Sequence, residues 1–325
     1  MRLSILIFVV AFPFAAVSHE SVATEPDQRL TPLPAVEHPS ENPTSLAKVS
    51  LGKKLFFDPR LSRTGDVSCS SCHDPKKAWS DGRQFGVGVD KEQGNRNTPS
   101  LFNVAYNKHQ FWDGRVSTLE QQALEPLQNP REMDMSLDAL VAKLAAIDAY
   151  RAEFKNVYGS NVTARNLAMA IAAFERTIIA DDLPIDRYAR GDVTALTPAS
   201  IRGMKLFFGD ARCHVCHTSS NFSDQKFHNV GIGVSDKTQG RAAISKQTKD
   251  LGAFKTPTLR EVTHTAPYMH DGSFKSLQEV VEHYNFGGVT DANNPTRDEL
   301  LQVLYLSEQQ VSDLVSFLKQ GLSSP

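Results

Sequence analysis

Two C-x-x-C-H pentapeptides constrain this chain more than any other feature. They are Cys69-Ser70-Ser71-Cys72-His73 and Cys213-His214-Val215-Cys216-His217, and together they use all four cysteines of the 325-residue sequence. The pattern is typical of covalent haem c attachment, in which two thiols bind one haem and the adjacent histidine is the proximal iron ligand. A lone C-x-x-C would also fit a zinc site or a thiol redox site. The complete pentapeptides therefore predict two haem c groups, held by Cys69, Cys72, His73, Cys213, Cys216 and His217.

The N-terminal residues predict export. An apolar run from Leu3 to Val17 follows a basic residue, and small side chains at positions 16–18 offer a cleavage site. The run is too short for a comfortable membrane span, although an uncleaved anchor is the alternative. We therefore expect a signal peptide over residues 1–18, an extended lead-in rich in Pro, Ser, Glu and Thr over residues 19–43, and a periplasmic protein without stable membrane insertion.

Helical patterns dominate the rest of the chain, with apolar residues spaced three and four apart. Thr197-Pro198 is typical of a helix start, and Ser276-x-x-Glu279 and Ser307-x-x-Gln310 are typical of capping boxes. Alternating strand patterns are scarce. The sequence predicts a mainly α protein, with helical patterns over residues 45–57, 136–158, 163–179, 197–208 and 276–284.

An internal repeat divides the chain into two like halves. Gly52-Lys53-Lys54-Leu55-Phe56-Phe57 precedes the first haem motif, and Gly203-Met204-Lys205-Leu206-Phe207-Phe208 precedes the second. Downstream and without a gap, Trp112-Asp113-Gly114 matches His270-Asp271-Gly272. Two like-folded halves, each holding one haem, explain these matches. We expect the halves at residues 44–185 and 186–325.

The same ungapped register places Pro126 opposite Tyr284. Proline has no side-chain atom that can bind iron, whereas a tyrosine oxygen can. We therefore expect an open first haem, able to bind peroxide, and a closed second haem suited to electron transfer. Chemical preference alone would rank a histidine or methionine above Tyr284. The alternative candidates for the outer ligand of the second haem are therefore His228, His264, Met269, His270 and His283.

Polar residues lie near the predicted open site. Gln122 precedes Pro126 by one helical turn, and Glu132 follows shortly after it. A positioned carboxyl group can move the proton that O–O cleavage needs, and an amide can orient peroxide. Their position in the sequence alone nevertheless favours the interpretation that both Gln122 and Glu132 are solvated surface side chains. Trp112 is either a core residue or an electron relay between the haems, and its position does not decide between them.

The paired motifs, together with residues 111–115 (Phe-Trp-Asp-Gly-Arg) and 266–272 (Ala-Pro-Tyr-Met-His-Asp-Gly), resemble the bacterial di-haem cytochrome c peroxidase and MauG family. The resemblance covers about residues 44–320. It implies two c-type cytochrome domains in tandem, with a peroxidatic first haem, an electron-transferring second haem and Trp112 between them. It also implies a peroxide pocket lined by Gln122, Pro126 and Glu132, in which the glutamate is the acid–base group.

The resemblance further implies a calcium ion between the domains. Asn97 matches its side-chain ligand, and Thr265 and Pro267 match positions that bind through backbone carbonyls. Amide and carbonyl oxygens are ligands that a hard cation prefers. Without the resemblance, the sequence gives no sign of this ion.

The chain departs from the commonest peroxidase pattern at two places. Many members carry a histidine after the first haem motif that blocks the peroxidatic iron, and residues 74–108 contain none here. The sequence therefore predicts a protein that needs no reductive activation. In addition, typical peroxidases have methionine where this chain has Tyr284, and tyrosine is the MauG pattern.

Three functions stay open at this point. The first is a peroxidase that takes electrons from a small cytochrome c or a cupredoxin, and the second is a MauG-like oxidase of a partner protein. The third, a non-catalytic di-haem electron carrier, has no use for the open site that Pro126 implies. The net charge of −2 gives no sign of nucleic-acid binding. Family members are often homodimers.

Overall fold

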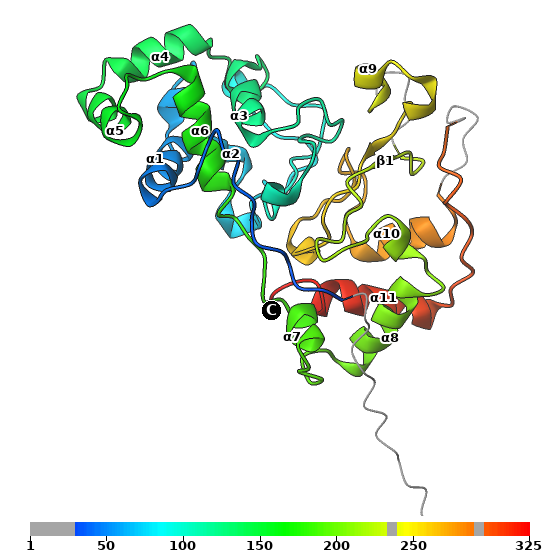
Figure 1. Ribbon diagram of the computed structural model, residues 1–325. Coiled ribbons are helices and arrows are strands. Elements are labelled where there is room, and N and C mark those ends of the chain that lie inside the picture. Colours follow the sequence, from blue (N-terminus) through cyan, green and yellow to red (C-terminus); the bar gives the residue numbers. More distant parts are fainter. Residues whose placement is uncertain (1–29, 233–238, 289–295) are drawn as a thin grey trace, which may run out of the picture.

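The computed structural model describes residues 30–232, 239–288 and 296–325, and it is mainly helical, as the sequence predicts. Figure 1 shows two lobes, the first coloured blue to green and the second green to red. The predicted signal peptide over residues 1–18 and the first part of the lead-in lie outside the described residues. Within the described ranges, no helix combines the length and the apolar character needed to cross a bilayer.

Each lobe is built around a pair of packed helices. In the first lobe α1 (Leu46–Phe56) packs against α6 (Ala164–Glu175), and in the second α8 (Pro198–Phe208) packs against α11 (Glu308–Gln320). The other helices are α2 (Cys69–Cys72), α3 (Leu119–Gln128), α4 (Leu137–Ala145), α5 (Asp148–Tyr158), α7 (Pro184–Ala189), α9 (Ala242–Ser245) and α10 (Leu277–Asn285).

Strand structure is limited to one short antiparallel pair in the part of the chain that the structure describes. β1 (Phe227–His228) pairs with β2 (Phe254–Lys255). Between the helices the chain forms long loops with single 3-10 turns, which are η1 (Pro59–Leu61), η2 (Pro75–Lys77), η3 (Val89–Lys91), η4 (Val104–Tyr106), η5 (Cys213–Val215), η6 (Thr248–Asp250) and η7 (Val262–His264).

The predicted helix starts are confirmed by their caps. The Thr197 hydroxyl accepts a hydrogen bond from the Ser200 N–H, and Pro198 is the first helical residue of α8. Both predicted capping boxes form, at the starts of α10 and α11. These side chains satisfy backbone N–H groups that have no partner inside the helix, so the local sequence alone determines where these helices begin.

The helix predicted over residues 136–158 is wrong as a single element. α4 ends at Ala145 and α5 begins at Asp148, because Ile147 has an extended backbone with φ −95° and ψ 112°. The side chain of Ile147 packs against the core of the first lobe. A bend here lets both helices bury their apolar faces against that core, which the three- and four-residue spacing could not reveal.

The two lobes have separate hydrophobic cores. The first runs from Leu51 to Ile178 and the second from Leu183 to Leu322. The predicted boundary between residues 185 and 186 lies close to this change of core, and it stays a prediction.

The repeat has a direct structural counterpart at the helix crossings. A Cβ atom at Gly52 would lie 1.9 Å from the carbonyl oxygen of Ala170, and one at Gly203 would lie 1.9 Å from that of Asp313. Each glycine therefore lets two helix backbones approach more closely than any side chain would allow. The two crossings are equivalent, so the helix pairs of the two lobes correspond residue by residue.

Equivalent turns also recur at the ungapped register of the repeat. An isolated bridge joins Gln110 to Val116, and its counterpart joins Tyr268 to Phe274. The helices that follow, α3 and α10, begin at Leu119 and Leu277. The register derived from the sequence is therefore the register of the fold.

Candidate functional site

A mostly apolar cavity of about 590 Å³ is lined by residues of both lobes. The residues that the sequence assigned to haem attachment, peroxide chemistry and calcium binding all lie in its wall. From the first half these are Cys69, Cys72, His73, Asn97, Trp112, Gln122, Pro126 and Glu132, and from the second half Cys213, Cys216, His217, Thr265, Pro267 and Tyr284.

The two haem motifs present their histidines in the same way. Nδ1–H of His73 donates to the carbonyl of Trp79 at 3.0 Å, and Nδ1–H of His217 donates to that of Phe222 at 2.9 Å. Because a carbonyl can only accept, each bond fixes the tautomer and leaves Nε2 as the atom that can bind iron. Two thiols and one such nitrogen in an apolar wall are the donor set of haem c, so each half fits one covalently attached haem.

The positions expected to decide the outer iron ligand are equivalent in the two halves. Pro126 is the eighth residue of α3, and Tyr284 is the eighth residue of α10. Both side chains line the cavity. Proline offers no donor atom and tyrosine offers an oxygen, so only the second half can supply a ligand from this position.

Glu132 is held in the cavity wall by its neighbours in the first half. The side-chain amide of Asn129 donates to Glu132 Oε1 at 2.7 Å, and the Val89 N–H donates to the backbone oxygen of Glu132 at 2.9 Å. Burial raises the pKa of the carboxyl group. Glu132 is therefore a partly buried carboxyl group, and not the solvated surface side chain that its position alone favoured.

Gln122 lies on α3 and also faces the cavity. Its Oε1 is buried and has no hydrogen-bond partner among the described residues. An unpaired buried amide oxygen costs free energy, so it marks a place where a further donor belongs. Gln122, like Glu132, is therefore not the solvated surface side chain that its position in the sequence favoured.

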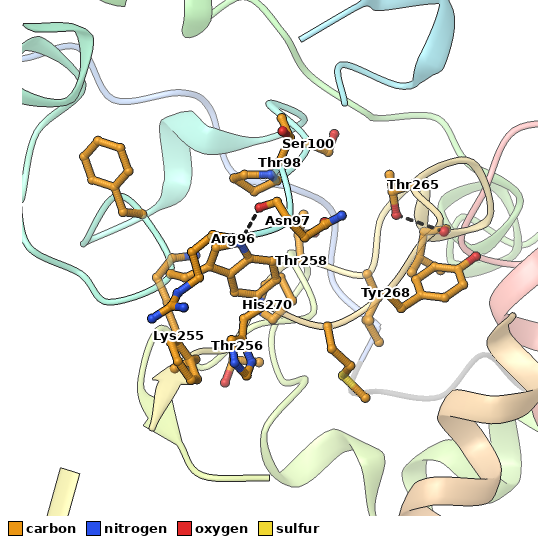
Figure 2. A pocket seen from close by; sticks show the side chains of 18 of the residues that line it. Arg96, Asn97, Thr98, Ser100, Lys255, Thr256, Thr258, Thr265, Tyr268 and His270 are labelled. Atoms are coloured by element: carbon orange, nitrogen blue, oxygen red, sulfur yellow. Dashed lines mark hydrogen bonds between the residues drawn. The ribbon is translucent and has the colours of Figure 1, made fainter. Parts of the chain in front are cut away.

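Trp112 is bound to both halves at the cavity wall. Its Nε1–H donates to the carbonyl of Asn97 at 2.8 Å, and its own carbonyl accepts from the Lys255 N–H at 2.8 Å. The Asn97 N–H in turn donates to the carbonyl of His270 at 2.8 Å. Figure 2 shows Asn97, Lys255 and His270 around the same pocket. The indole therefore lies where residues of the two halves meet.

Three of the candidate outer ligands for the second haem already have partners. His228 is hydrogen-bonded through both ring nitrogens, to Asp224 at 2.8 Å and to Asp298 at 2.5 Å. The bond to Asp224 is the main cause that raises the pKa of His228, to about 11. Two more histidines, His264 and His283, donate from Nε2 to backbone carbonyls. These contacts engage both ring nitrogens of His228 and the Nε2 atom of the other two, and neither His264 nor His283 lines the cavity.

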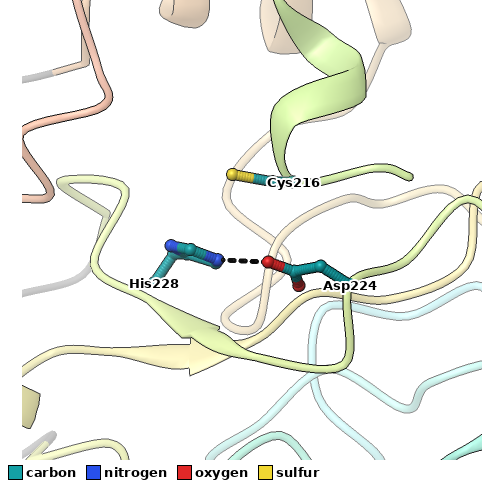
Figure 3. A group of neighbouring side chains, drawn as sticks. All are labelled: Cys216, Asp224 and His228. Carbon is teal, nitrogen blue, oxygen red and sulfur yellow. Dashed lines mark hydrogen bonds and ion pairs between the residues drawn. The ribbon is translucent and has the colours of Figure 1, made fainter.

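Cys216, Asp224 and His228 lie close enough together to suggest a separate metal site (Figure 3). However, Cys216 belongs to the second haem motif, and His228 has no ring nitrogen left. We therefore assign Cys216 to haem attachment and the other two to an ion pair beside it.

Met269 and His270 are also candidate outer ligands, and both line the cavity. His270 stacks on Phe254 with ring centroids 3.6 Å apart, and burial lowers its pKa to about 4. Its Nε2 has no hydrogen-bond partner among the described residues.

The residues expected to bind calcium have the required oxygens available. The side-chain N–H of Asn97 donates to the carbonyl of Arg83 at 2.9 Å, which turns Oδ1 the other way. The Thr265 hydroxyl donates to the carbonyl of Val262 at 3.0 Å (Figure 2), so the carbonyl of Thr265 is not engaged by its own side chain. Together with the carbonyl of Pro267, this donor set is chemically suitable for a hard cation.

Among the charged residues of the cavity wall that sequence reasoning missed are Glu175 and Lys255. Glu175 ends α6 and is only 3% exposed, and burial raises its pKa to about 8. Lys255 is 8% exposed, and burial lowers its pKa to about 8. The repeat register offered a signal for Lys255, because it places this lysine opposite Asn97. For Glu175 the signal was an acidic residue on the apolar face of a predicted helix.

Comparison with known proteins gives concordant findings. A family model described as "Di-haem cytochrome c peroxidase" matches residues 46–194, and a cytochrome c model matches residues 200–321. The methylamine utilization protein MauG of Methylorubrum extorquens is 41% identical over 294 residues, which cover 90% of this chain and 82% of that protein.

Two further relatives are similar along nearly their whole length. Cytochrome-c peroxidase IdrP1 of Pseudomonas sp. (strain SCT) is 38% identical, with all of this chain and 93% of that protein covered. A solved structure of a MauG-like protein associated with microbial copper homeostasis is 34% identical, with a TM-score of 0.82 and coverage of 90% of this chain and 93% of the other.

Proposed function

The chain belongs to the di-haem cytochrome c peroxidase and MauG family, a family of haem c oxidoreductases, and on that premise we propose that it reduces hydrogen peroxide to water. The balanced reaction consumes one peroxide, two electrons and two protons and releases two water molecules. When attached, haem c supplies the iron at which peroxide is reduced and the path by which electrons reach it.

The contrast between Pro126 and Tyr284 carries this proposal. Both residues stand at the same helical position and line the cavity, but only Tyr284 has an atom that can bind iron. The first half therefore keeps room for a small substrate, and the second half holds a ligand from its own chain. A protein that only carried electrons would gain nothing from this difference.

Glu132 is the proposed acid–base group. Its carboxyl group can take a proton from one oxygen of peroxide and give it to the leaving oxygen, and burial raises its pKa above that of an exposed glutamate. Asn129 holds Oε1 of Glu132 and also lines a second, open polar pocket, together with Arg115 and Glu125. We propose that protons and water reach Glu132 from that pocket past Asn129, and that the unpaired Oε1 of Gln122 orients peroxide.

Trp112 is the proposed electron relay. Its indole is hydrogen-bonded to Asn97, and its backbone is bonded to Lys255 of the other half, so its position relative to both haem motifs is held on two sides. A relay benefits from such a fixed position, because electron transfer depends steeply on distance.

We also propose a calcium ion held by Asn97 Oδ1 and the carbonyls of Thr265 and Pro267. The ion would join the two halves beside Trp112. Further proposals from the sequence are export to the periplasm with cleavage near Ser18, an electron donor that is a small cytochrome c or a cupredoxin, and a homodimer.

One pair of observations favours a second candidate function, oxidation of residues in a partner protein, as in MauG-type enzymes. Tyr284 stands in place of the usual methionine, and residues 74–108 provide no histidine to close the first site. A phenolate ligand stabilises oxidised iron, which favours keeping oxidising equivalents over passing electrons onward.

The experiment that separates these functions is peroxide-driven oxidation of a reduced small cytochrome c by the fully ferric protein, without reductive pretreatment. Sustained turnover on the order of 10 per second or more is the expected result for a peroxidase. Peroxide consumption without cytochrome oxidation would favour the MauG-type function. If both haems are low-spin and the protein does not react with peroxide, the remaining function is that of a non-catalytic electron carrier.

A further inference from the structure

The ammonium group of Lys255 lies in the wall of the cavity without an anion. Lys255 is 8% exposed and lines the cavity, and no described residue forms a hydrogen bond or ion pair with its Nζ. Burying an unpaired charge costs several kcal/mol in general, so a lysine in this position needs a partner that the polypeptide does not supply. Burial alone accounts for its lowered pKa, which is the behaviour of a cation without a counter-charge.

Two other basic side chains contact the ring of Phe254, the residue that precedes Lys255 in β2. The guanidinium of Arg96 lies over this ring at 5.0 Å from its centroid, and the imidazole of His270 stacks on it at 3.6 Å. Arg96 donates only to the carbonyl of its neighbour Asn95, and His270 Nε2 has no partner in the described part of the chain. Figure 2 shows Arg96, Lys255 and His270 lining one side of the pocket. We refer to these three residues as the basic wall.

Asp113 and Asp271 are the carboxylates whose charges act on Arg96, and Asp271 also acts on His270. Asp113 is paired with Arg115, and Asp224 and Asp298 are both bound to His228. No described carboxylate forms an ion pair with Lys255 or Arg96. Lys255 has no such carboxylate beside it in the described part of the chain, so we look for its anion in a molecule that occupies the cavity.

Haem c brings such anions, because each haem carries two propionate carboxylates in addition to the vinyl groups that join the cysteines. We propose that the basic wall of Arg96, Lys255 and His270 is a propionate-binding site, in which the ammonium of Lys255 forms the main ion pair. The inference rests on the two haem c groups and is independent of the peroxidase proposal.

The position of Lys255 gives this ion pair a consequence for electron transfer. Its N–H is bonded to Trp112, and Lys255 stands in the repeat register where the first half has Asn97. A fixed positive charge next to a propionate offsets the negative charge beside the haem, so it favours the reduced iron. Lys255 is thus a positioning residue that ties the haem, the backbone of the relay tryptophan and the junction of the two halves together.

The test compares Lys255→Met with the wild-type holoprotein. Methionine keeps the length and the apolar stem of the side chain and removes only the charge. We expect both haems to remain attached, the propionate bending band in the resonance Raman spectrum of one haem to shift, and the reduction potential of that haem to fall. Lys255→Arg keeps the charge and should return the potential towards the wild-type value.

Lys249→Met is the matched control, because Lys249 is an exposed lysine of the same lobe. It should leave the Raman bands and both potentials unchanged. If Lys255→Met does not accumulate as holoprotein, Arg96→Gln at the more open edge of the basic wall should give a smaller shift in the same direction.

Unchanged propionate bands and unchanged potentials in the folded Lys255 and Arg96 variants would overturn the proposal. Peroxide turnover does not enter this test, so a failed peroxidase proposal and a failed propionate site give different results. In the first case the potentials shift but the protein has no turnover, and in the second the protein turns over with unshifted potentials.

Discussion

The two halves of the molecule share a scaffold and differ in the residues that face the cavity. The glycine crossings at Gly52 and Gly203 are equivalent, and so are the bridges that precede α3 and α10. Within that common frame, Pro126 stands opposite Tyr284. By the same correspondence of the helix pairs, Glu175 at the end of α6 stands opposite Leu318 of α11, and both line the cavity.

This comparison teaches that equivalent positions of a duplicated fold can carry different chemistry while the scaffold stays the same. The scaffold depends on glycines, caps and core contacts that both halves keep, because changing them would cost stability in either half. The inward-facing positions can differ more, since their side chains line the cavity, although some of them, such as Leu318, also join the core. The predictions below test this division, from the largest expected effect to the smallest.

Glu132 should matter only to chemistry in the first half. We expect Glu132→Gln to slow the reaction with peroxide by about 10²–10⁴-fold, because the amide cannot transfer the proton. Stopped-flow absorbance with peroxide measures this, and mass spectrometry checks that both haems remain attached. Glu92→Gln, at an exposed glutamate of the same half, is the control. An unchanged rate would remove Glu132 from the mechanism.

Tyr284 should matter only to the second half. Tyr284→Phe removes the phenol oxygen and keeps the ring, so we expect the low-spin signal of the second haem to be replaced by a high-spin signal. Electron paramagnetic resonance of the ferric protein measures the change, with Tyr305→Phe as the control because Tyr305 is 87% exposed. An unaltered low-spin signal would mean another ligand, such as Met269 or a histidine.

The glycine crossings should matter equally to both halves. Gly52→Ala and Gly203→Ala each force a Cβ against a backbone carbonyl, and we expect each to lower the free energy of unfolding by about 1–3 kcal/mol. Urea unfolding followed by circular dichroism measures the loss. At Gly94 the nearest atom to an added Cβ is 3.7 Å away, so Gly94→Ala should have little effect. If only one of the two variants, Gly52→Ala or Gly203→Ala, lost stability, the equivalence of the crossings would be contradicted.

Glu175 should give the first half a pH dependence that Leu318, at the equivalent position of the second half, cannot give. Burial raises its pKa to about 8 from the ordinary value of 4.5, so between these values the folded state holds a proton that the unfolded state releases. Stability should therefore fall as the pH rises from 4.5 towards 8, by about 1.4 kcal/mol for each unit of the pKa displacement.

Glu175→Leu copies the residue of the second half, and we expect it to remove this fall. The free energy of unfolding at pH 5 and at pH 8.5 measures the difference. Glu299→Gln, at an exposed glutamate, should keep the wild-type dependence. A wild-type protein that is equally stable at both values would show that Glu175 is not buried as a neutral acid.

Much of the local structure could be predicted from the sequence, because it depends only on neighbouring residues. The caps at Thr197, Ser276 and Ser307 were predictable because a cap needs only a side chain and the next turn of backbone. The break between α4 and α5 was not predictable, because both segments keep helical spacing. Only the shape of the core that Ile147 joins requires the bend.

The sequence by itself determined the features that depend on covalent pattern and repetition. Residue spacing can be read from the sequence without a structure. It gave the two haem motifs, the mainly helical class, the duplicated halves and the pairing of Pro126 with Tyr284 at equivalent positions. Tertiary structure alone decided which residues share one cavity, that Glu132 and Gln122 line it, and that His228 is already held by two aspartates. Burial, hydrogen-bond partners and unpaired charges such as Lys255 arise from segments far apart in the chain, and only the folded arrangement of those segments creates them.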